Sequence, residues 1–199
     1  MINQNFVLLG VVIEFVGGLI YIIETLKGTI QPNKISWLLW SIYTLIAFAA
    51  EVSQGVGIVS LTTFITGFCP FLVFIASFFN KKSQWKITKF DIGCGLLSIL
   101  GILLWYITKT GNFAILFSII ADTLAGLPTI IKSYNEPETE NDFVFSFGII
   151  NAGIGLLVIN VWNFQNYGFP LYLLLIQTLF FVLIRFKLGK KIKLSHKLS

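Results

Sequence analysis

The chain has 199 residues, of which 56% are hydrophobic and only 12% are charged, and its formal net charge is +5. Because about a quarter of the residues of an ordinary soluble domain are charged, this composition and a mean hydropathy of +0.85 exclude that class and predict an integral membrane protein. No group of His, Cys or carboxylate residues has the spacing of a catalytic or metal site. We therefore expect neither an enzyme nor a bound cofactor or metal.

Seven apolar segments are candidates to cross a hydrocarbon core about 30 Å thick. In chain order they are residues 5–26, 35–50, 55–79, 90–108, 112–133, 143–162 and 167–186. The first segment lacks the positive start and cleavage site of a secretory signal, so we expect it to be a retained span. The sequence therefore predicts an all-α membrane protein with seven transmembrane helices.

The positions of the basic residues predict how the seven spans are oriented in the membrane, because Lys and Arg concentrate on the cytoplasmic side of membrane proteins. With seven crossings, 13 of the 14 basic residues fall on one side and only Lys109 falls on the other. This distribution predicts an outside N-terminus and a cytoplasmic C-terminus, in the inner (cell) membrane of a prokaryote. For the basic cytoplasmic tail, residues 188–199, we expect contact with anionic lipid and no nucleic-acid partner.

An offset of 108 residues lays the segment 118–142 on the segment 10–34 without a gap. Asp122 then falls on Glu14, and Asn141 falls on Asn33. Asn141 or Asp142 can cap the helix that follows, and Pro32 and Asn33 hold the matching place before the second segment. Chance similarity between apolar segments is the alternative, and the paired acids are the informative feature. A true repeat predicts two parallel three-helix units, residues 1–80 and 110–187, joined by a linker helix within residues 81–109.

Glu14 and Asp122 lie deep in their apolar segments, about 20 Å and about 15 Å from the cytoplasmic surface at 1.5 Å per helical residue. Acids at that depth face the bundle interior or a wet cavity, and they mark solute or proton pathways. A dehydrated carboxylate favours its neutral form, so each acid could carry a proton. The alternative is that each acid only bonds to a neighbouring helix.

Helical spacing places further polar residues near the two acids. A step of seven residues leads from Glu14 to Tyr21 and from Asp122 to Thr129, and the small residues between them could simply let helices pack closely. In the second segment Trp40 and Tyr43 share a face with Trp37, which also suits an aromatic belt at the interface. Asn151 lies 108 residues after Tyr43 and needs a partner in hydrocarbon, either in a cavity or on a neighbouring helix.

The segment 127–132, with the sequence LPTIIK, is similar to the Pro-Gln loop signature of SWEET-type transporters in the PQ-loop (MtN3/saliva) superfamily. Thr129 stands where that signature has Gln. The resemblance implies two three-helix repeats joined by a linker helix, with solutes bound between them near the midplane. It also implies hinge prolines at Pro128 and Pro32, and a Trp and an Asn beside a bound sugar, for which Trp40 and Asn151 are the candidates.

The leading hypothesis is a transporter that moves a small polar solute (a sugar, nucleoside, vitamin or amino acid) by alternating access and proton coupling. The cavity is expected between the first, second, fifth and sixth spans. Its predicted pathway residues are Glu14, Tyr21, Trp40, Tyr43, Asp122, Thr129 and Asn151, with Pro32 and Pro128 as hinges. The alternative is a membrane receptor or assembly protein that binds a ligand without transport. Besides the solute, the expected partner is the lipid bilayer, and a homo-oligomer is left open.

Overall fold

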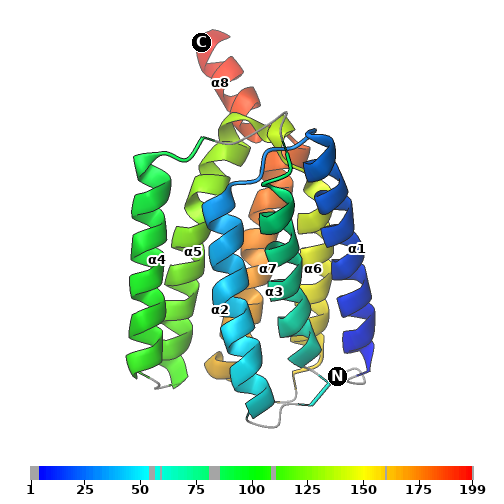
Figure 1. Ribbon diagram of the computed structural model, residues 1–199, viewed down its shortest axis with the longest axis vertical. Coiled ribbons are helices and arrows are strands. Elements are labelled where there is room, and N and C mark those ends of the chain that lie inside the picture. Colours follow the sequence, from blue (N-terminus) through cyan, green and yellow to red (C-terminus); the bar gives the residue numbers. More distant parts are fainter. Residues whose placement is uncertain are drawn as a thin grey trace.

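Helices make up nearly all of the computed structural model (Figure 1), which describes residues 5–53, 57–58, 60–80, 86–108, 111–159 and 161–198. The helices are α1 (Phe6–Lys27), α2 (Lys34–Ser53), α3 (Ser60–Ala76), α4 (Lys89–Thr108), α5 (Gly111–Asn135), α6 (Asp142–Leu157), α7 (Phe164–Arg185) and α8 (Leu188–Leu198), with a 3-10 turn η1 (Pro137–Thr139). These ranges contain no β-strand, so the prediction of an all-α protein is confirmed for them.

Short polar signals set the end of α1 and the starts of α2 and α6. Gly28 ends α1 in a left-handed conformation with φ 75°, and its N–H bonds the carbonyls of Glu24 and Thr25. Of the two candidate caps of α6, Asn141 is the cap, because its side chain accepts a 2.7 Å hydrogen bond from the Phe143 amide. At the matching place, the Asn33 side chain accepts from the amides of Ile35 and Ser36 at the start of α2.

The helix ends follow the 108-residue offset. α1 ends at Lys27 and α5 ends at Asn135, which are 108 positions apart. α2 begins at Lys34 and α6 begins at Asp142, again 108 positions apart. Matching ends of this kind place Glu14 and Asp122 at the same height in their helices.

The packing of the helices also follows a pattern that occurs twice. α3 packs against both α1 and α2, and α7 packs against both α5 and α6. The two sets of three meet where α1 contacts α6 and where α2 contacts α5, while α4 lies at one edge against α5 (Figure 1). Six helices thus surround a common centre, and α4 stands outside their ring.

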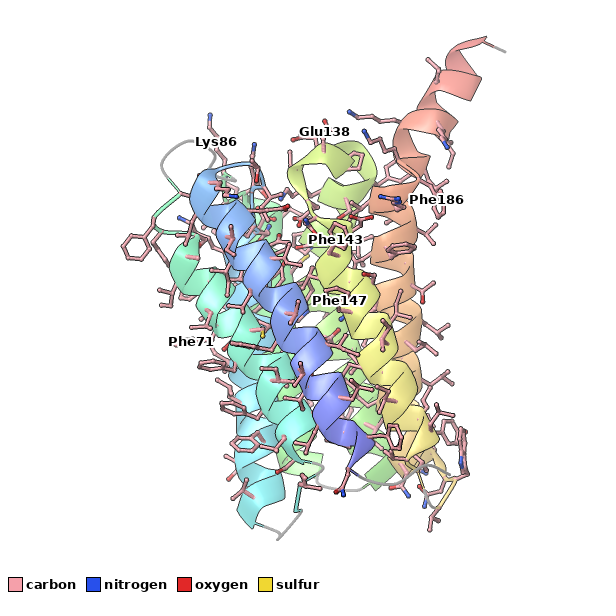
Figure 2. All side chains as sticks on the ribbon, turned by 90° about the vertical axis from the view of Figure 1, so that its right-hand side faces the viewer. Phe71, Lys86, Glu138, Phe143, Phe147 and Phe186 are labelled. Atoms are coloured by element: carbon pink, nitrogen blue, oxygen red, sulfur yellow. The ribbon has the colours of Figure 1, made fainter. Side chains whose placement is uncertain are left out.

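The outer surface carries the side chains that a lipid environment favours. Phe71, Phe143 and Phe186 are 40 to 49% exposed and point away from the bundle (Figure 2). Among the described residues, three helices are long and apolar enough to cross a membrane: Phe6–Lys27, Ile115–Asn135 and Asn166–Arg185. α3 and α6 are apolar but shorter. These helices support the prediction of a membrane protein, while the count of seven spans stays a prediction.

Two predicted segments are longer than the helices in them. The helix in the third segment begins at Ser60, whose hydroxyl bonds the Gly57 carbonyl, after the non-helical residues 57–58; the predicted start at residue 55 lies outside the described residues. The sixth ends at Leu157, and α7 begins after the capping residue Asn163. Apolar composition marks lipid contact and burial but not the end of a helix, which explains both errors. Lys81, Lys82 and Lys109, used above for orientation, lie outside the described residues.

The basic tail forms the helix α8, which the sequence reasoning did not predict. The chain turns at Lys187, with φ 51°, and α8 extends beyond the ends of the other helices (Figure 1). Gly189 lies so close to α5 that a Cβ there would be 1.9 Å from the Tyr134 carbonyl oxygen. Lys190 and Glu138 form an exposed 2.7 Å ion pair. α8 is thus attached to the bundle at its first turn.

Candidate functional site

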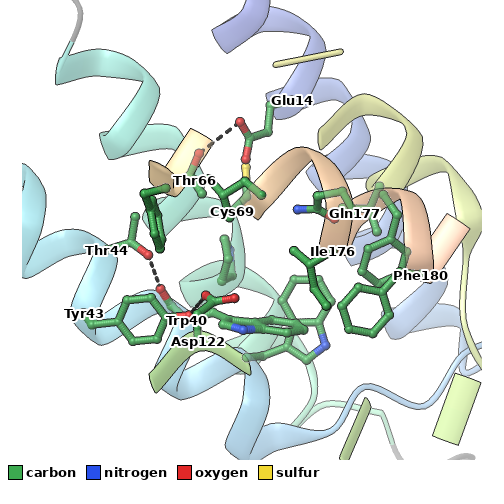
Figure 3. A pocket seen from close by; sticks show the side chains of 16 residues that line it. Glu14, Trp40, Tyr43, Thr44, Thr66, Cys69, Asp122, Ile176, Gln177 and Phe180 are labelled. Carbon is green, nitrogen blue, oxygen red and sulfur yellow. Dashed lines mark hydrogen bonds between the residues drawn. The ribbon is translucent and has the colours of Figure 1, made fainter. Parts of the chain in front are cut away.

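A cavity of about 70 Å³ lies at the centre of the ring of six helices (Figure 3). This is several times the space needed by one water molecule, and about half of the volume that admits benzene in an engineered protein cavity. Residues from all six helices line it: Glu14, Trp37, Trp40, Tyr43, Thr44, Thr66, Cys69, Pro70, Asp122, Val144, Phe145, Phe169, Leu173, Ile176, Gln177 and Phe180. The prediction that four helices line the cavity was therefore incomplete, because α3 and α7 contribute as well.

Four of the predicted pathway residues line this cavity: Glu14, Trp40, Tyr43 and Asp122. The two acids come from helices that share few sequence identities, yet they face the same space. Glu14 is 8% exposed and Asp122 is 7% exposed. Neither side chain faces lipid, as their depth in the sequence predicted.

Glu14 is held by neighbours on two other helices. Its Oε2 atom accepts a 3.1 Å hydrogen bond from the Thr66 hydroxyl of α3 and another from the Asn151 amide of α6. Close packing permits this arrangement, since a Cβ at Gly17 would lie 2.4 Å from Phe147 and a Cβ at Gly18 would lie 2.6 Å from Cys69 Sγ. The small residues after Glu14 thus serve close packing, as the plainer interpretation held.

Asp122 is held by two tyrosines. Tyr43 of α2 donates to Oδ1, and Tyr172 of α7 donates to Oδ2 at 2.6 Å. The Tyr172 hydroxyl in turn lies 3.0 Å from the Thr123 hydroxyl. Because both carboxylate oxygens accept hydrogen bonds, this geometry suits the ionised form of Asp122, which is an acceptor only.

Aromatic rings cover the side of the cavity next to α2 and α7. The ring centroid of Trp40 lies 5.3 Å from that of Trp37 and 5.9 Å from that of Phe180, each pair edge to face. Phe180 stacks on Phe145 with a centroid distance of 4.6 Å. These contacts fix the Trp40 indole beside Asp122 (Figure 3).

Three predicted pathway residues do not line the cavity. Asn151 lies behind Glu14 and bonds it. Thr129 is fully buried and donates to the Ser36 hydroxyl at 2.9 Å. Tyr21 is also fully buried and donates to Glu140 Oε2 at 2.5 Å. The step of seven residues from each acid therefore leads to a buried residue on the same helix, Tyr21 or Thr129, but that residue does not line the cavity.

The predicted hinge prolines have different positions. Pro128 lies inside α5, which continues to Asn135. Pro32 is buried in the connection between α1 and α2. A further proline, Pro70, lies inside α3 and lines the cavity. Its missing N–H leaves the carbonyl of Thr66 without the usual helical donor, in the same residue whose hydroxyl bonds Glu14.

A buried polar layer separates the cavity from the end of the bundle that carries Lys27, Lys34 and Arg185, called here the basic end. Lys132 and Glu140 pair at 2.7 Å, and both side chains have no solvent exposure. Lys132 also donates to the Gln31 carbonyl, and the Gln31 amide donates to the Thr139 carbonyl at 2.8 Å. We name Tyr21, Lys132 and Glu140 the basic-end layer. It joins the α1–α2 connection to the α5–α6 connection.

Sequence reasoning missed several residues of this centre. The sequence did not identify Tyr172 as a residue of the site, because a tyrosine in an apolar helix is equally typical of a membrane interface. Lys132 was counted only for orientation, although ten residues of helix separate it from Asp122 and so place it above the cavity. Thr66 and Gln177 also line the cavity, but a hydroxyl or amide group in an apolar segment can bond its own backbone and so carries little signal in the sequence.

Within the described ranges, no three His, Cys, Asp or Glu side chains come together in a group that could hold a metal ion. Comparisons of the chain with protein-family models, with curated proteins and with solved structures give no match.

Proposed function

We propose that the chain is a membrane transporter that moves a small polar solute by alternating access, with Glu14 and Asp122 exchanging protons as the solute passes. One observation carries this proposal. The two acids lie at equivalent positions of α1 and α5, their side chains are buried, and both line the same cavity at the centre of an apolar bundle. Intramembrane acids that converge on one cavity are typical of solute and proton pathways.

The twofold pattern supports two parallel three-helix units, α1 to α3 and α5 to α7, with α4 as the linker. The matched helix ends, the two capping asparagines and the recurring contacts all fit that arrangement. It is the architecture that the resemblance to SWEET-type transporters implies. We place the basic end in the cytoplasm, following the positive-inside rule over seven crossings.

The charges of the cavity supply the reason for proton coupling. Among the residues that line it, all of them in the described part of the chain, none is basic. Two ionised carboxylates would then be buried without a counter-charge, which is costly, and protonation removes the cost. A solute that changes the surroundings of either acid would therefore shift its proton occupancy.

The basic-end layer supplies a gate. Tyr21 reaches from α1 to Glu140 next to α6, and Lys132 reaches from α5 to the α1–α2 connection. Since these bonds join the two proposed units, a path to the basic end opens only when the units separate there. The cavity volume also indicates that the units must separate, because a solute as large as a sugar ring does not fit in about 70 Å³ unless the helices move apart.

Transport is tested by uptake into liposomes that contain the purified protein. Labelled sugars, nucleosides, amino acids and small amines are presented singly, and exchange is measured against an internal pool of the same unlabelled compound. Saturable exchange of at least one compound, absent from protein-free liposomes, is the expected result. Binding of a solute without any exchange would support the receptor alternative and contradict the proposal.

A further inference from the structure

We propose that the solute is a small organic cation that carries an ammonium group and a hydroxyl, bound between Glu14, Asp122 and the Trp40 ring. This inference rests on the proposed function and adds the chemical class of the solute. It follows from three properties of the cavity: its charge, its unpaired Gln177 oxygen and its size.

The charge of the cavity is negative on more than one side. Glu14 approaches from α1 and Asp122 from α5, and the lining residues include no Lys, Arg or His. The titratable groups packed against the two acids are the Cys69 thiol, beside Glu14, and the Tyr43 and Tyr172 hydroxyls, on Asp122. None of these three groups is ever cationic, so a positive charge must come from outside the protein.

Lys132 does not supply that charge. Its Nζ atom is bonded to Glu140 at 2.7 Å and to the Gln31 carbonyl, within the basic-end layer. Asp122 is ten residues away along α5, which corresponds to about 15 Å. At that distance the Lys132–Glu140 pair acts as a dipole and not as the counter-ion of either acid.

Aromatic faces give a cation a second kind of partner. The Trp40 indole lies beside Asp122 and is held edge to face between Trp37 and Phe180. A cation within about 6 Å of an indole face is attracted by the ring, and tryptophan is the best of the side chains for this contact. A neutral solute would gain stacking but would leave protons as the only compensation for the two carboxylates.

An unpaired polar atom points to the rest of the ligand. Gln177 lines the cavity, and its Oε1 atom is buried and has no hydrogen-bond partner among the described residues. Because a buried polar group without a partner costs about 1–3 kcal/mol, such an atom marks a place where a bound molecule is expected to bond. A hydroxyl or an ammonium group of the solute can donate to Gln177. The Trp37 indole, by contrast, already interacts with the Tyr21 side chain.

The size of the cavity favours a small head group over a sugar or nucleoside. A volume of about 70 Å³ is about half of that which admits benzene, so the helices must move apart for any solute larger than a few atoms. A cation of the size of choline needs less of this movement than a sugar or a nucleoside.

The test compares matched probes on the purified full-length protein in detergent at one pH. Choline has both the charge and the hydroxyl, 3,3-dimethylbutan-1-ol is its uncharged isostere, and tetramethylammonium has the charge alone. A ligand that binds the folded state raises the apparent melting temperature by mass action. We expect the largest shift with choline, a smaller one with tetramethylammonium and none with the alcohol. This comparison needs no variant.

Variants then locate the bound charge. Asp122→Asn and Glu14→Gln keep the shape of each side chain, and each is expected to weaken choline binding at least tenfold, whereas the exposed Glu136→Gln leaves it unchanged. The proposal is overturned if the alcohol binds as well as choline, if neither cation binds at millimolar concentration, or if both cavity variants bind choline normally. If choline binds but no solute is exchanged in liposomes, the transport proposal is contradicted and the cation site is supported. If neutral sugars are exchanged and choline neither binds nor is exchanged, transport is supported and the cation site is contradicted.

Discussion

Lys132 and Glu140 form an ion pair with Nζ and Oε1 2.7 Å apart and with both side chains fully buried. Both residues belong to the second proposed unit, and the pair is bonded to the first unit through the Gln31 carbonyl, which accepts from Lys132, and through Tyr21, which donates to Glu140. A buried pair with these bonds is the feature on which the proposed gate depends.

Glu140→Gln is expected to lower thermal stability strongly, because removing one partner of a buried pair costs about 3–5 kcal/mol. The melting temperature of the detergent-solubilised protein measures the effect. Glu138→Gln is the matched control, since the Lys190–Glu138 pair is half exposed and such pairs contribute about 0–1 kcal/mol. Equal melting temperatures for the two variants would show that the Lys132–Glu140 pair does not hold this end of the bundle together.

The same variant is expected to open the cavity toward the basic end. Cys69 lines the cavity and is 3% exposed, so its alkylation by maleimide reports on access, in a Cys94→Ala background. We expect faster alkylation of Cys69 in Glu140→Gln than in the parent when the reagent is applied from the basic end. The rate with Glu138→Gln should match the parent. A rate that is the same in all three proteins would argue against a gate at this layer.

Much of this arrangement could be predicted from the sequence, because local signals determine it. Asn33 and Asn141 mark the starts of α2 and α6, and the shared register of the two acids is enough to predict that they face one cavity. The missed parts depend on contacts between distant segments. Tyr172 bonds an acid 50 residues away, and Lys132 bonds a carbonyl 101 residues away. Helical periodicity determines which face a side chain lies on but not which side chain meets it across the bundle.

Tyr172→Phe is expected to weaken binding of the cation about 10- to 100-fold, because a hydrogen bond to a charged group contributes about 1.5–3 kcal/mol. Its hydroxyl donates to Asp122 Oδ2 at 2.6 Å and so stabilises the ionised carboxylate that the cation needs. Tyr167→Phe removes a hydroxyl from the same helix away from the cavity and serves as the control. Calorimetric titration with choline measures both. Unchanged affinity in Tyr172→Phe would show that this bond is not needed for binding.

Gly17→Ala is expected to destabilise the protein even though alanine is the better helix former by about 1 kcal/mol. A Cβ at this position would lie 2.4 Å from Phe147 Cδ2 and 3.1 Å from its Cβ, so α1 and α6 would have to separate. Overpacking of this kind typically costs about 1–3 kcal/mol. Gly153→Ala in α6 is the control, because a Cβ there meets nothing within 4 Å. Melting temperatures in the reverse order would contradict the packing of α1 against α6.

The attachment of α8 is expected to weaken in acid. A hydrogen bond from Lys190 lowers the pKa of Glu138 below its usual value. A group whose pKa is lower in the folded state stabilises that state above its unfolded pKa, and the contribution is lost as the pH falls through the folded value. Proteolysis of α8 should therefore accelerate below the ordinary pKa range of glutamate, and Glu138→Gln should remove that dependence. Acceleration on raising the pH instead would reverse the sign and contradict the assignment.

The most direct test of the central claim is solute-driven proton movement across liposomes that contain the protein, followed with a pH-sensitive dye trapped inside. For a solute that exchanges, we expect proton movement with the parent protein and with Glu136→Gln, and a loss of that movement with Glu14→Gln and with Asp122→Asn. Proton movement that is unchanged in both cavity variants would contradict the account.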